Sequence, residues 1–451
     1  MKNINLTEGD ITKSLLKLSL PIIGTNFIQT AYGMIDMIWI GRLGSASVAA
    51  IGTATFFINL AMAISTLIVI GTGVKISHAI GRGDSEEAEI YIKNGVILSI
   101  ILASVYTLFI FIFKTNLIEF YDLQKDVFNM AVNYLEISAV GILFMYLNSL
   151  LTTIFNSYGE SKMPFLANTV GFLFNIILDP ILIFGTSIIK PSGVIGAAVA
   201  TLVSRIIVFI IFIIFSRKRL SFLTKGINLN YTKGIGVIKL GLPITMQRVI
   251  FTLISIMVAK IVSDFGATAI AVQKVGVQIE SISYITIGGL QGAIAAFMGQ
   301  NFGAKNKDRI KFGYYKSLKL TIIFGSFITL IFLIFPKQIF SIFLSEKEAL
   351  DMGVTYMRVL AFSQIFMCAE LLTVGAFNGI GKTYIAPIIS ITFTSLRIPC
   401  AIILSNPNLF GLNGIWMSIS VSSLFKGVIL VTLFLIGLRK LNFRDIGEAG
   451  I

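Results

Sequence analysis

The stretch LSLPIIG at residues 18–24 returns 222 positions later as LGLPITM at residues 240–246. The same offset aligns further pairs along the chain: Gly44 with Gly266, Ala49 with Ala271, Gly81 with Gly303, Tyr134 with Tyr356, Ala139 with Ala361, Phe144 with Phe366, Met145 with Met367, Asn156 with Asn378 and Gly159 with Gly381. A slip of about four residues then aligns Gly193 and Gly196 with Gly411 and Gly414. So long a repeat predicts two similar halves.

The composition places both halves in a membrane. Hydrophobic residues make up 55% of the 451 residues, and charged residues only 13%, about half the share of a soluble domain. So few charges cannot cover so much apolar surface in water. The composition excludes a cytosolic enzyme, a disordered chain and a nucleic-acid-binding module, and indicates a helical protein that crosses the membrane many times.

Apolar runs between polar breaks predict an all-α polytopic membrane protein with twelve transmembrane helices in two six-helix lobes. The predicted spans cover residues 14–40, 47–74, 91–113, 130–155, 163–185, 194–215, 236–262, 267–298, 317–335, 353–378, 384–405 and 412–437. Six spans in each half give both halves the same orientation, as in parallel-repeat transporters. We expect an N-lobe at 1–215, a cytoplasmic linker at 216–235 and a C-lobe at 236–451.

Lysine and arginine indicate the orientation. They concentrate in the short loops on the side of the N-terminus and are sparse in the loops on the other side. Because cytoplasmic loops carry this excess, both termini are predicted to face the cytoplasm.

Charged side chains inside the spans are functional candidates, since a charge at mid-membrane costs at least about 2.5–3.5 kcal/mol. Asp36 lies five residues before Gly41, and Asp179 lies six before Gly185. At 1.5 Å per residue, each carboxylate is roughly 7–9 Å from the outer end of its helix. Thr201 enters the next helix at a similar depth, so oxygen-bearing side chains from three helices are expected to meet.

Other polar side chains belong to the same predicted cluster. Asn175 precedes Asp179 by four residues and shares its helix face, as Tyr32 and Gln29 share a face with Asp36. Pro180 is expected to bend the helix beside Asp179. The acids of this half are expected to have no basic partner at their depth. Such a cluster suits a hard cation or a shared proton, with sodium at Asp36 and Asp179 as the metal candidate; packing between helices by polar contacts is the alternative.

The second half carries charges of both signs within its spans. Glu280 and Glu370 are candidates for contact with a cationic substrate in a central cavity, and Asn148 of the first half is a third. The alternative is that these charges pair among themselves, for instance Glu370 with Arg397 on the next helix.

An enzyme is a remote alternative. Intramembrane aspartyl proteases carry GxGD and YD motifs, and this chain has Gly81-Arg82-Gly83-Asp84 and Tyr121-Asp122. Both motifs lie in predicted loops, on opposite membrane sides and in reversed order. The sequence also has no phosphate-binding Walker A motif and no metal-ligand cluster, so no cofactor is expected.

Three stretches resemble the multidrug and toxic compound extrusion (MATE) transporters, in their DinF-like bacterial branch. The opening LTEGDITKSLLKLSLPIIGTNFIQTAYGMIDMIWIGRLG resembles the first helix of that family. NIILDPILIFG at 175–185, followed by GVIGAAVATLVSR, resembles the fifth and sixth helices. The resemblance covers essentially the whole chain.

The resemblance implies a secondary active antiporter, rather than an enzyme, that exports amphipathic organic cations such as drugs and dyes in exchange for inward sodium or protons. It implies a bacterial cytoplasmic membrane location, alternating access of two lobes, and function as a monomer. In this branch Asp36, Asn175, Asp179 and Thr201 match the ion-coupling residues. Another branch uses carboxylates on the seventh and tenth helices; Glu370 is on the tenth, but the seventh offers Gln247 and Arg248. The alternative function is a lipid-linked oligosaccharide flippase of a related branch.

Overall fold

The computed structural model describes residues 5–216 and 230–441, and this part of the chain is almost entirely helical, with no strand. The predicted linker lies mostly outside the described residues. The helices of the first half are α1 (Ile11–Gly41), α2 (Ser45–Arg82), α3 (Ser85–Glu119), α4 (Lys125–Ser157), α5 (Lys162–Phe184) and α6 (Gly193–Ser216). Those of the second half are α7 (Tyr231–Ser263), α8 (Ala267–Gly303), α9 (Lys307–Ile334), α10 (Pro336–Phe340), α11 (Lys347–Gly379), α12 (Ile385–Ser395), α13 (Arg397–Leu404) and α14 (Leu412–Arg439).

The prediction of an all-α membrane protein is confirmed, and in the part of the chain that the structure describes, eleven of the twelve predicted spans qualify by length and composition. Among the described residues, eleven helical segments are long and apolar enough to cross a membrane. The predicted span that is not among these eleven is the first, α1. It is 31 residues long but carries polar residues such as Asn26 and Gln29 in its middle. The remaining elements come from the short helix α10 and from a break in the span Ile385–Leu404.

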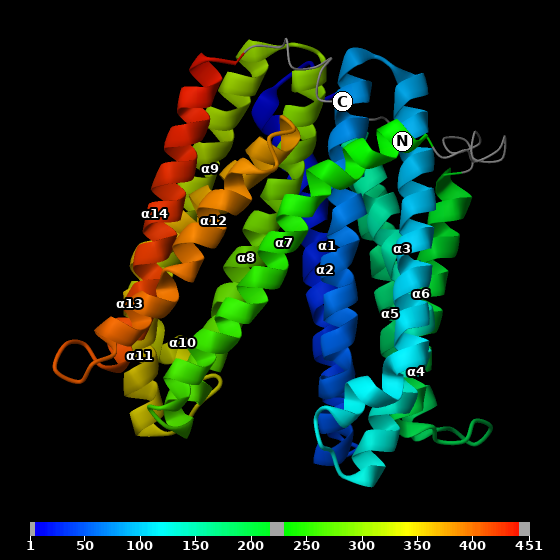
Figure 1. The fold of residues 1–451 in the computed structure, drawn as a ribbon, viewed down its shortest axis with the longest axis vertical. Coiled ribbons are helices and arrows are strands. Elements are labelled where there is room, and N and C mark those ends of the chain that lie inside the picture. The colour runs from blue at the N-terminus through cyan, green and yellow to red at the C-terminus, as the bar shows by residue number, and fades with distance from the viewer. Residues whose placement is uncertain (1–4, 217–229, 442–451) are drawn as a thin grey trace. The chain divides into compact units, whose positions relative to one another are not determined.

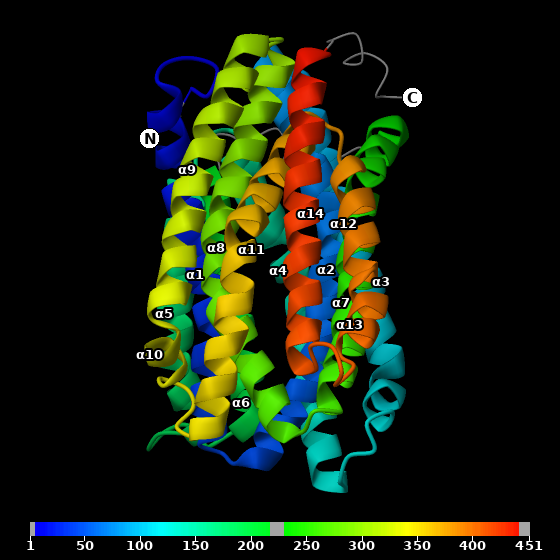
Figure 2. The same cartoon turned by 90° about the vertical axis from the view of Figure 1, so that its left-hand side faces the viewer.

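The break divides the predicted helix 384–405 into α12 and α13. Pro399 has no N–H to donate to the carbonyl of Ser395, and its ring crowds that carbonyl. Helix α12 accordingly ends at Ser395, and α13 begins at Arg397. Both pieces pack beside α14 (Figures 1 and 2).

By packing, the chain forms two compact units. Within the described residues, the first consists of residues 20–216 and 230–241, and the second of residues 5–19 and 242–441. Compared with the predicted lobes, each unit takes the beginning of the other half's first helix: the start of α7 packs in the first unit, and the start of α1 in the second. We call residues 5–19 and 230–241 the exchanged segments.

Each exchanged segment is held by specific contacts within its unit. In the first unit, Lys233 forms an ion pair with Glu87, and Gly71 has no room for a side chain because Val237 O lies against it. In the second unit, the Arg309 guanidinium donates to the carbonyls of Leu6 (3.0 Å), Glu8 (2.9 Å) and Gly9 (2.8 Å), the residues just before α1.

The repeat is visible in the backbone as well as in the sequence. Gly159 and Gly381 lie two residues after the ends of α4 and α11, each with φ of 79°, a left-handed conformation that glycine adopts without strain. Asp84 and Asn306 cap α3 and α9 by accepting from a backbone N–H three residues later. These 222-residue correspondences show that the two halves fold alike.

The helices of each unit pack around apolar cores. In the first unit, α2 lies against α3 and α4, and α5 lies against α6; in the second, α11 contacts α8, α9 and α14 (Figures 1 and 2). Large apolar side chains such as Ile112 and Phe327 remain exposed on outer faces, as the lipid-facing surface of a spanning helix requires.

Candidate functional site

The first unit brings together the four predicted ion-coupling residues. The Thr201 hydroxyl of α6 donates to Asp36 Oδ2 of α1 at 3.3 Å. The Asn175 side-chain amide donates to Asp179 Oδ1, one turn along α5, at 3.2 Å. The Asp36 and Asp179 carboxyl groups are close enough to interact electrostatically with each other. Three helices therefore contribute to one polar cluster.

This cluster is rich in acceptor oxygens. Asn175 and Asp179 are completely buried, with 0% of their surface exposed. In the described part of the chain, Asp36 Oδ1, Asn175 Oδ1 and Asp179 Oδ2 are buried without a hydrogen-bond donor. A buried acceptor without a donor is costly, and two adjacent carboxylates repel one another. Both costs are relieved by a proton or by a small hard cation.

Close packing at a glycine allows the helices to converge. Asn175 and Asp179 are four residues apart and point from the same face of α5. One turn before them, a side chain at Gly171 would overlap Val208 of α6 and lie 2.8 Å from the hydroxyl of Tyr32 of α1. The missing side chain lets α1 and α6 both approach α5 at the level of the site.

Sequence reasoning missed a basic residue beside this cluster. Arg205 lies one turn after Thr201 on α6, and its guanidinium interacts electrostatically with Asp36, Tyr32 and Tyr134. The expectation that the acids have no basic partner was therefore wrong. The signal was present in the sequence, since Arg205 lies inside a predicted span, but it is about 6 Å along the helix from Thr201.

Of the three residues expected to support the cluster, Tyr32 lies in the site and Gln29 is exposed. Tyr32 lies in the site and packs its ring against Phe172, with ring centres 5.1 Å apart. Gln29 is exposed, and the described residues include no hydrogen-bond partner for its side chain. Helix α5 continues through Pro180, which leaves the carbonyl of Ile176 without a backbone donor; the bend expected there stays a prediction.

In the second unit Glu370 is engaged by its neighbours. Its Oε2 lies 3.0 Å from the Lys426 ammonium of α14, and its Oε1 accepts from the Ser390 hydroxyl at 3.1 Å. The suggested ion pair between Glu370 and Arg397 was therefore wrong, because Glu370 pairs with Lys426. Arg397 instead donates from Nε to Ser422 and from Nη2 to Ser423.

The other two cavity candidates differ from Glu370. Asn148 is the repeat counterpart of Glu370, and its side-chain amide donates to the carbonyl of Arg205 at 2.9 Å, so it joins α4 to α6. Glu280 has a buried Oε1 without a partner among the described residues and interacts electrostatically with Arg397. Glu280 is therefore the acid of the second unit whose side chain is least satisfied.

The site contains no cluster typical of a transition metal. Across the described residues, no group of three or more His, Cys, Asp or Glu side chains lies close enough to hold a metal ion. The donor set around Asp36 combines two carboxylates with an amide and a hydroxyl, all of them oxygen ligands. Such a set fits an alkali cation or a proton rather than a soft metal.

Comparison with known proteins identifies the family. The MatE family model matches the chain twice, at residues 21–181 and 243–403, so its two matches are separated by the 222 residues of the internal repeat. The chain is 25% identical to the probable multidrug resistance protein NorM of Thermotoga maritima over 95% of its own length and 93% of the relative's. It is 26% identical to the probable multidrug resistance protein YoeA of Bacillus subtilis, over 91% and 90% of the two chains.

Solved structures share the fold. A crystal structure of a MATE protein in a bent conformation superposes with a TM-score of 0.91, at 22% identity and with 98% of each chain covered. The repeat, the spans, and the two matches of the family model agree with one another. The chain belongs to the MatE family of membrane transporters and is not an enzyme.

Proposed function

We propose that this protein is a secondary antiporter that exports amphipathic organic cations, drugs and dyes among them, in exchange for inward sodium or protons. The observation that carries the proposal is the cluster of Asp36, Asp179 and their hydrogen-bond partners, in which three buried acceptor oxygens have no donor among the described residues. The names of the relatives from Thermotoga maritima and Bacillus subtilis support drug export. The proposed location is the bacterial cytoplasmic membrane, with both termini inside and the monomer as the working unit.

The charges in the site indicate how many ions it takes. Two ionised aspartates carry two negative charges, and Arg205 supplies one positive charge nearby. One further monovalent cation, either a proton on a carboxyl group or a sodium ion between the two, makes the group neutral. Because uncompensated charge is costly away from water, we propose that one monovalent cation binds per transport cycle.

Gradient-driven transport tests the proposal. The purified protein is reconstituted into liposomes loaded with a fluorescent lipophilic cation such as ethidium, and sodium and proton gradients are imposed separately. Asp36→Asn and Asp179→Asn should each abolish gradient-driven efflux, because the amide keeps the shape and loses the charge. Thr201→Ala removes a hydrogen bond to a charged group and should weaken ion affinity about tenfold; Asn175→Ala should have a similar, mild effect.

A matched control is Asp126→Asn, which removes an exposed acid at the start of α4 and should leave efflux unchanged. Unchanged ion dependence in both Asp36→Asn and Asp179→Asn would place the coupling site elsewhere, with Glu280 as the next candidate. Scrambling of a lipid-linked oligosaccharide without any gradient, in the absence of cation efflux, would favour the flippase instead.

A further inference from the structure

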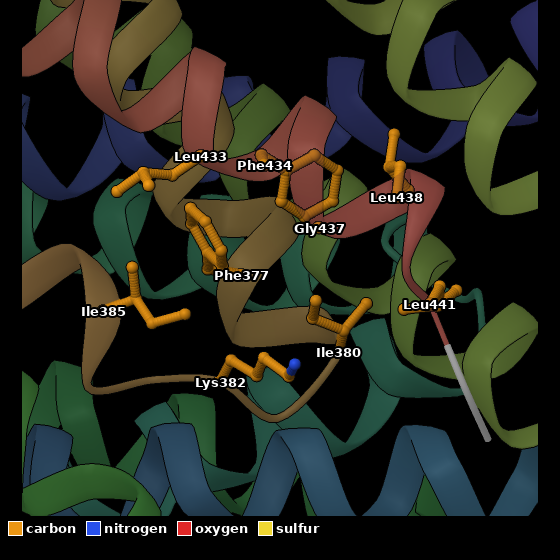
Figure 3. A pocket seen from close by; sticks show the side chains of 9 residues that line it. All are labelled: Phe377, Ile380, Lys382, Ile385, Leu433, Phe434, Gly437, Leu438 and Leu441. Carbon is orange, nitrogen blue, oxygen red and sulfur yellow. The ribbon is translucent and has the colours of Figure 1, made fainter. Parts of the chain in front are cut away.

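A small apolar cavity lies in the second unit, far along the helices from Glu280 and Arg397. It has a volume of about 120 Å³ and lies between the end of α11, the start of α12 and the end of α14. Its walls are Phe377, Ile380, Lys382, Ile385, Leu433, Phe434, Gly437, Leu438 and Leu441. Figure 3 shows these side chains around one space, with Lys382 along one edge.

The lining selects an apolar occupant. Apart from Lys382, every side chain of the wall is a hydrocarbon or absent. An engineered apolar cavity of about 150 Å³ excludes water and holds benzene, so this cavity suits a short piece of hydrocarbon chain. A free inorganic anion would gain nothing from the walls formed by Phe377 and Phe434.

The backbone places Lys382 at the edge of the cavity. Helix α11 ends at Gly379, and Gly381 takes the left-handed conformation with φ of 79°. The Lys382 N–H then donates to the carbonyl of Phe377 at 3.0 Å, which is the closing bond of a Schellman motif. The position of Lys382 is thus set by hydrogen bonds, and its ammonium forms no ion pair with the described residues.

The lysine is particular to the second half. The first half has the same turn, in which Glu160 N–H donates to the carbonyl of Phe155 at 2.9 Å. The repeat therefore has a glutamate where the second half has Lys382. Because the two turns share their geometry, this turn does not require a basic side chain, and the positive charge of Lys382 is not needed to form it.

Further basic groups surround the same end of the unit. Helix α14 ends at Arg439, and Lys440 follows it, next to the wall residue Leu441. The Lys307 ammonium donates to the carbonyls of Arg439 and Leu441, at 3.3 and 3.4 Å. This end belongs to the side of the bundle predicted from the loop charges to face the cytoplasm, where anionic lipid headgroups attract basic residues.

We propose that this cavity binds a phospholipid with an anionic headgroup from the cytoplasmic leaflet. Its phosphate lies against Lys382, and part of an acyl chain lies against the wall that Phe377 and Phe434 form together, with their ring centres 5.0 Å apart. The lysine stem covers the apolar wall while its ammonium reaches the headgroup level. Such a lipid connects the end of α11 to the end of α14 and is independent of the ion-coupling site.

The test measures lipid binding to the purified full chain. Dioleoyl phosphatidylglycerol and dioleoyl phosphatidylcholine share their chains and differ in headgroup charge, so native mass spectrometry with each lipid separates the two parts of the site. The wild type should prefer phosphatidylglycerol. Lys382→Ala should bind that lipid about fivefold more weakly and lose the preference, while Lys311→Ala, which removes an exposed lysine of α9, should keep it.

A second pair of variants tests the cavity itself. A side chain at Gly437 would meet no atom within 4 Å, so Gly437→Leu can fill the space without straining the helix and should reduce binding of both lipids. Gly437→Ala should have little effect. The proposal fails if Lys382→Ala keeps the headgroup preference, if Gly437→Leu binds both lipids like the wild type, or if glycerol 3-phosphate without chains competes as well as phosphatidylglycerol.

Discussion

Replacing Lys426 by methionine should destabilise the second unit strongly. The Lys426 ammonium lies 3.0 Å from Glu370 Oε2, and the two residues are only 4% and 5% exposed. Methionine matches the length of the lysine stem but leaves the Glu370 carboxylate buried without a counter-charge. Breaking a buried pair in this way costs about 3–5 kcal/mol, because the remaining charge is not compensated by water.

The double variant separates the charge from the packing. In Glu370→Gln with Lys426→Met no buried charge remains, and the Ser390 hydroxyl can still donate to the amide oxygen of the new glutamine. Replacing a buried pair by neutral groups of similar volume is often neutral for stability. The double variant should therefore lie within about 1 kcal/mol of the wild type, although it carries one substitution more than Lys426→Met.

Thermal unfolding of the purified protein in detergent measures both effects. For a unit of this size, 1 kcal/mol corresponds to a shift in Tm of roughly 2–4 °C. Lys426→Met should thus lower Tm by about 6–20 °C, whereas Lys260→Met, which changes an exposed lysine of α7, should leave it unchanged. A wild-type Tm for Lys426→Met, or a double variant as unstable as the single one, would refute the reasoning.

Three further predictions concern packing, charge and topology. Gly71→Ala should lower the stability by about 1–3 kcal/mol, and with it Tm, because its Cβ would overlap a carbonyl of α7. Gly52→Ala, in open space on α2, should leave Tm unchanged, and equal Tm values for the two variants would contradict this prediction. Arg205→Gln should lower the half-saturating sodium or proton concentration for efflux about tenfold, since a positive charge beside the cation site is lost; an unchanged value would remove Arg205 from the site. In a cysteine-free background, a cysteine replacing Lys162 should react with impermeant thiol reagents only from the cytoplasmic side, and one replacing Lys347 only from outside; the reverse pattern would invert the predicted orientation.

Much of the fold could be predicted from the sequence because the repeat and the apolar runs are long. Apolar length fixes where a helix crosses the membrane, and the offset of 222 residues confirms the number of helices in each half. The break between α12 and α13 was missed, although Pro399 indicates it. A proline within an apolar run does not always end a helix, since α5 continues through Pro180.

The first-unit cluster could be predicted from depth alone. Asp36, Asp179 and Thr201 lie at similar distances from the same end of their helices, and neighbouring helices bring residues of equal depth together. Arg205 lies deeper by about one turn and was overlooked because depth was measured at the backbone. A long arginine side chain reaches across that distance.

The pairing in the second unit could not be predicted in the same way. Arg397 and Lys426 were both available to Glu370 along the sequence. The choice between them depends on how α11, α13 and α14 are rotated about their axes, and on Ser422 and Ser423, which engage the Arg397 guanidinium. Rotation of this kind is set by packing across three helices and leaves no periodic signal in one of them.

The exchanged segments bear on how such a protein could arise from a shorter one. A single half, standing alone, would keep a binding surface for the first turns of a partner's helix and would offer its own first turns in return. Two copies would therefore satisfy each other as a domain-swapped dimer. The present chain has the same reciprocal exchange within one polypeptide, because residues 5–19 pack in the second unit and residues 230–241 in the first.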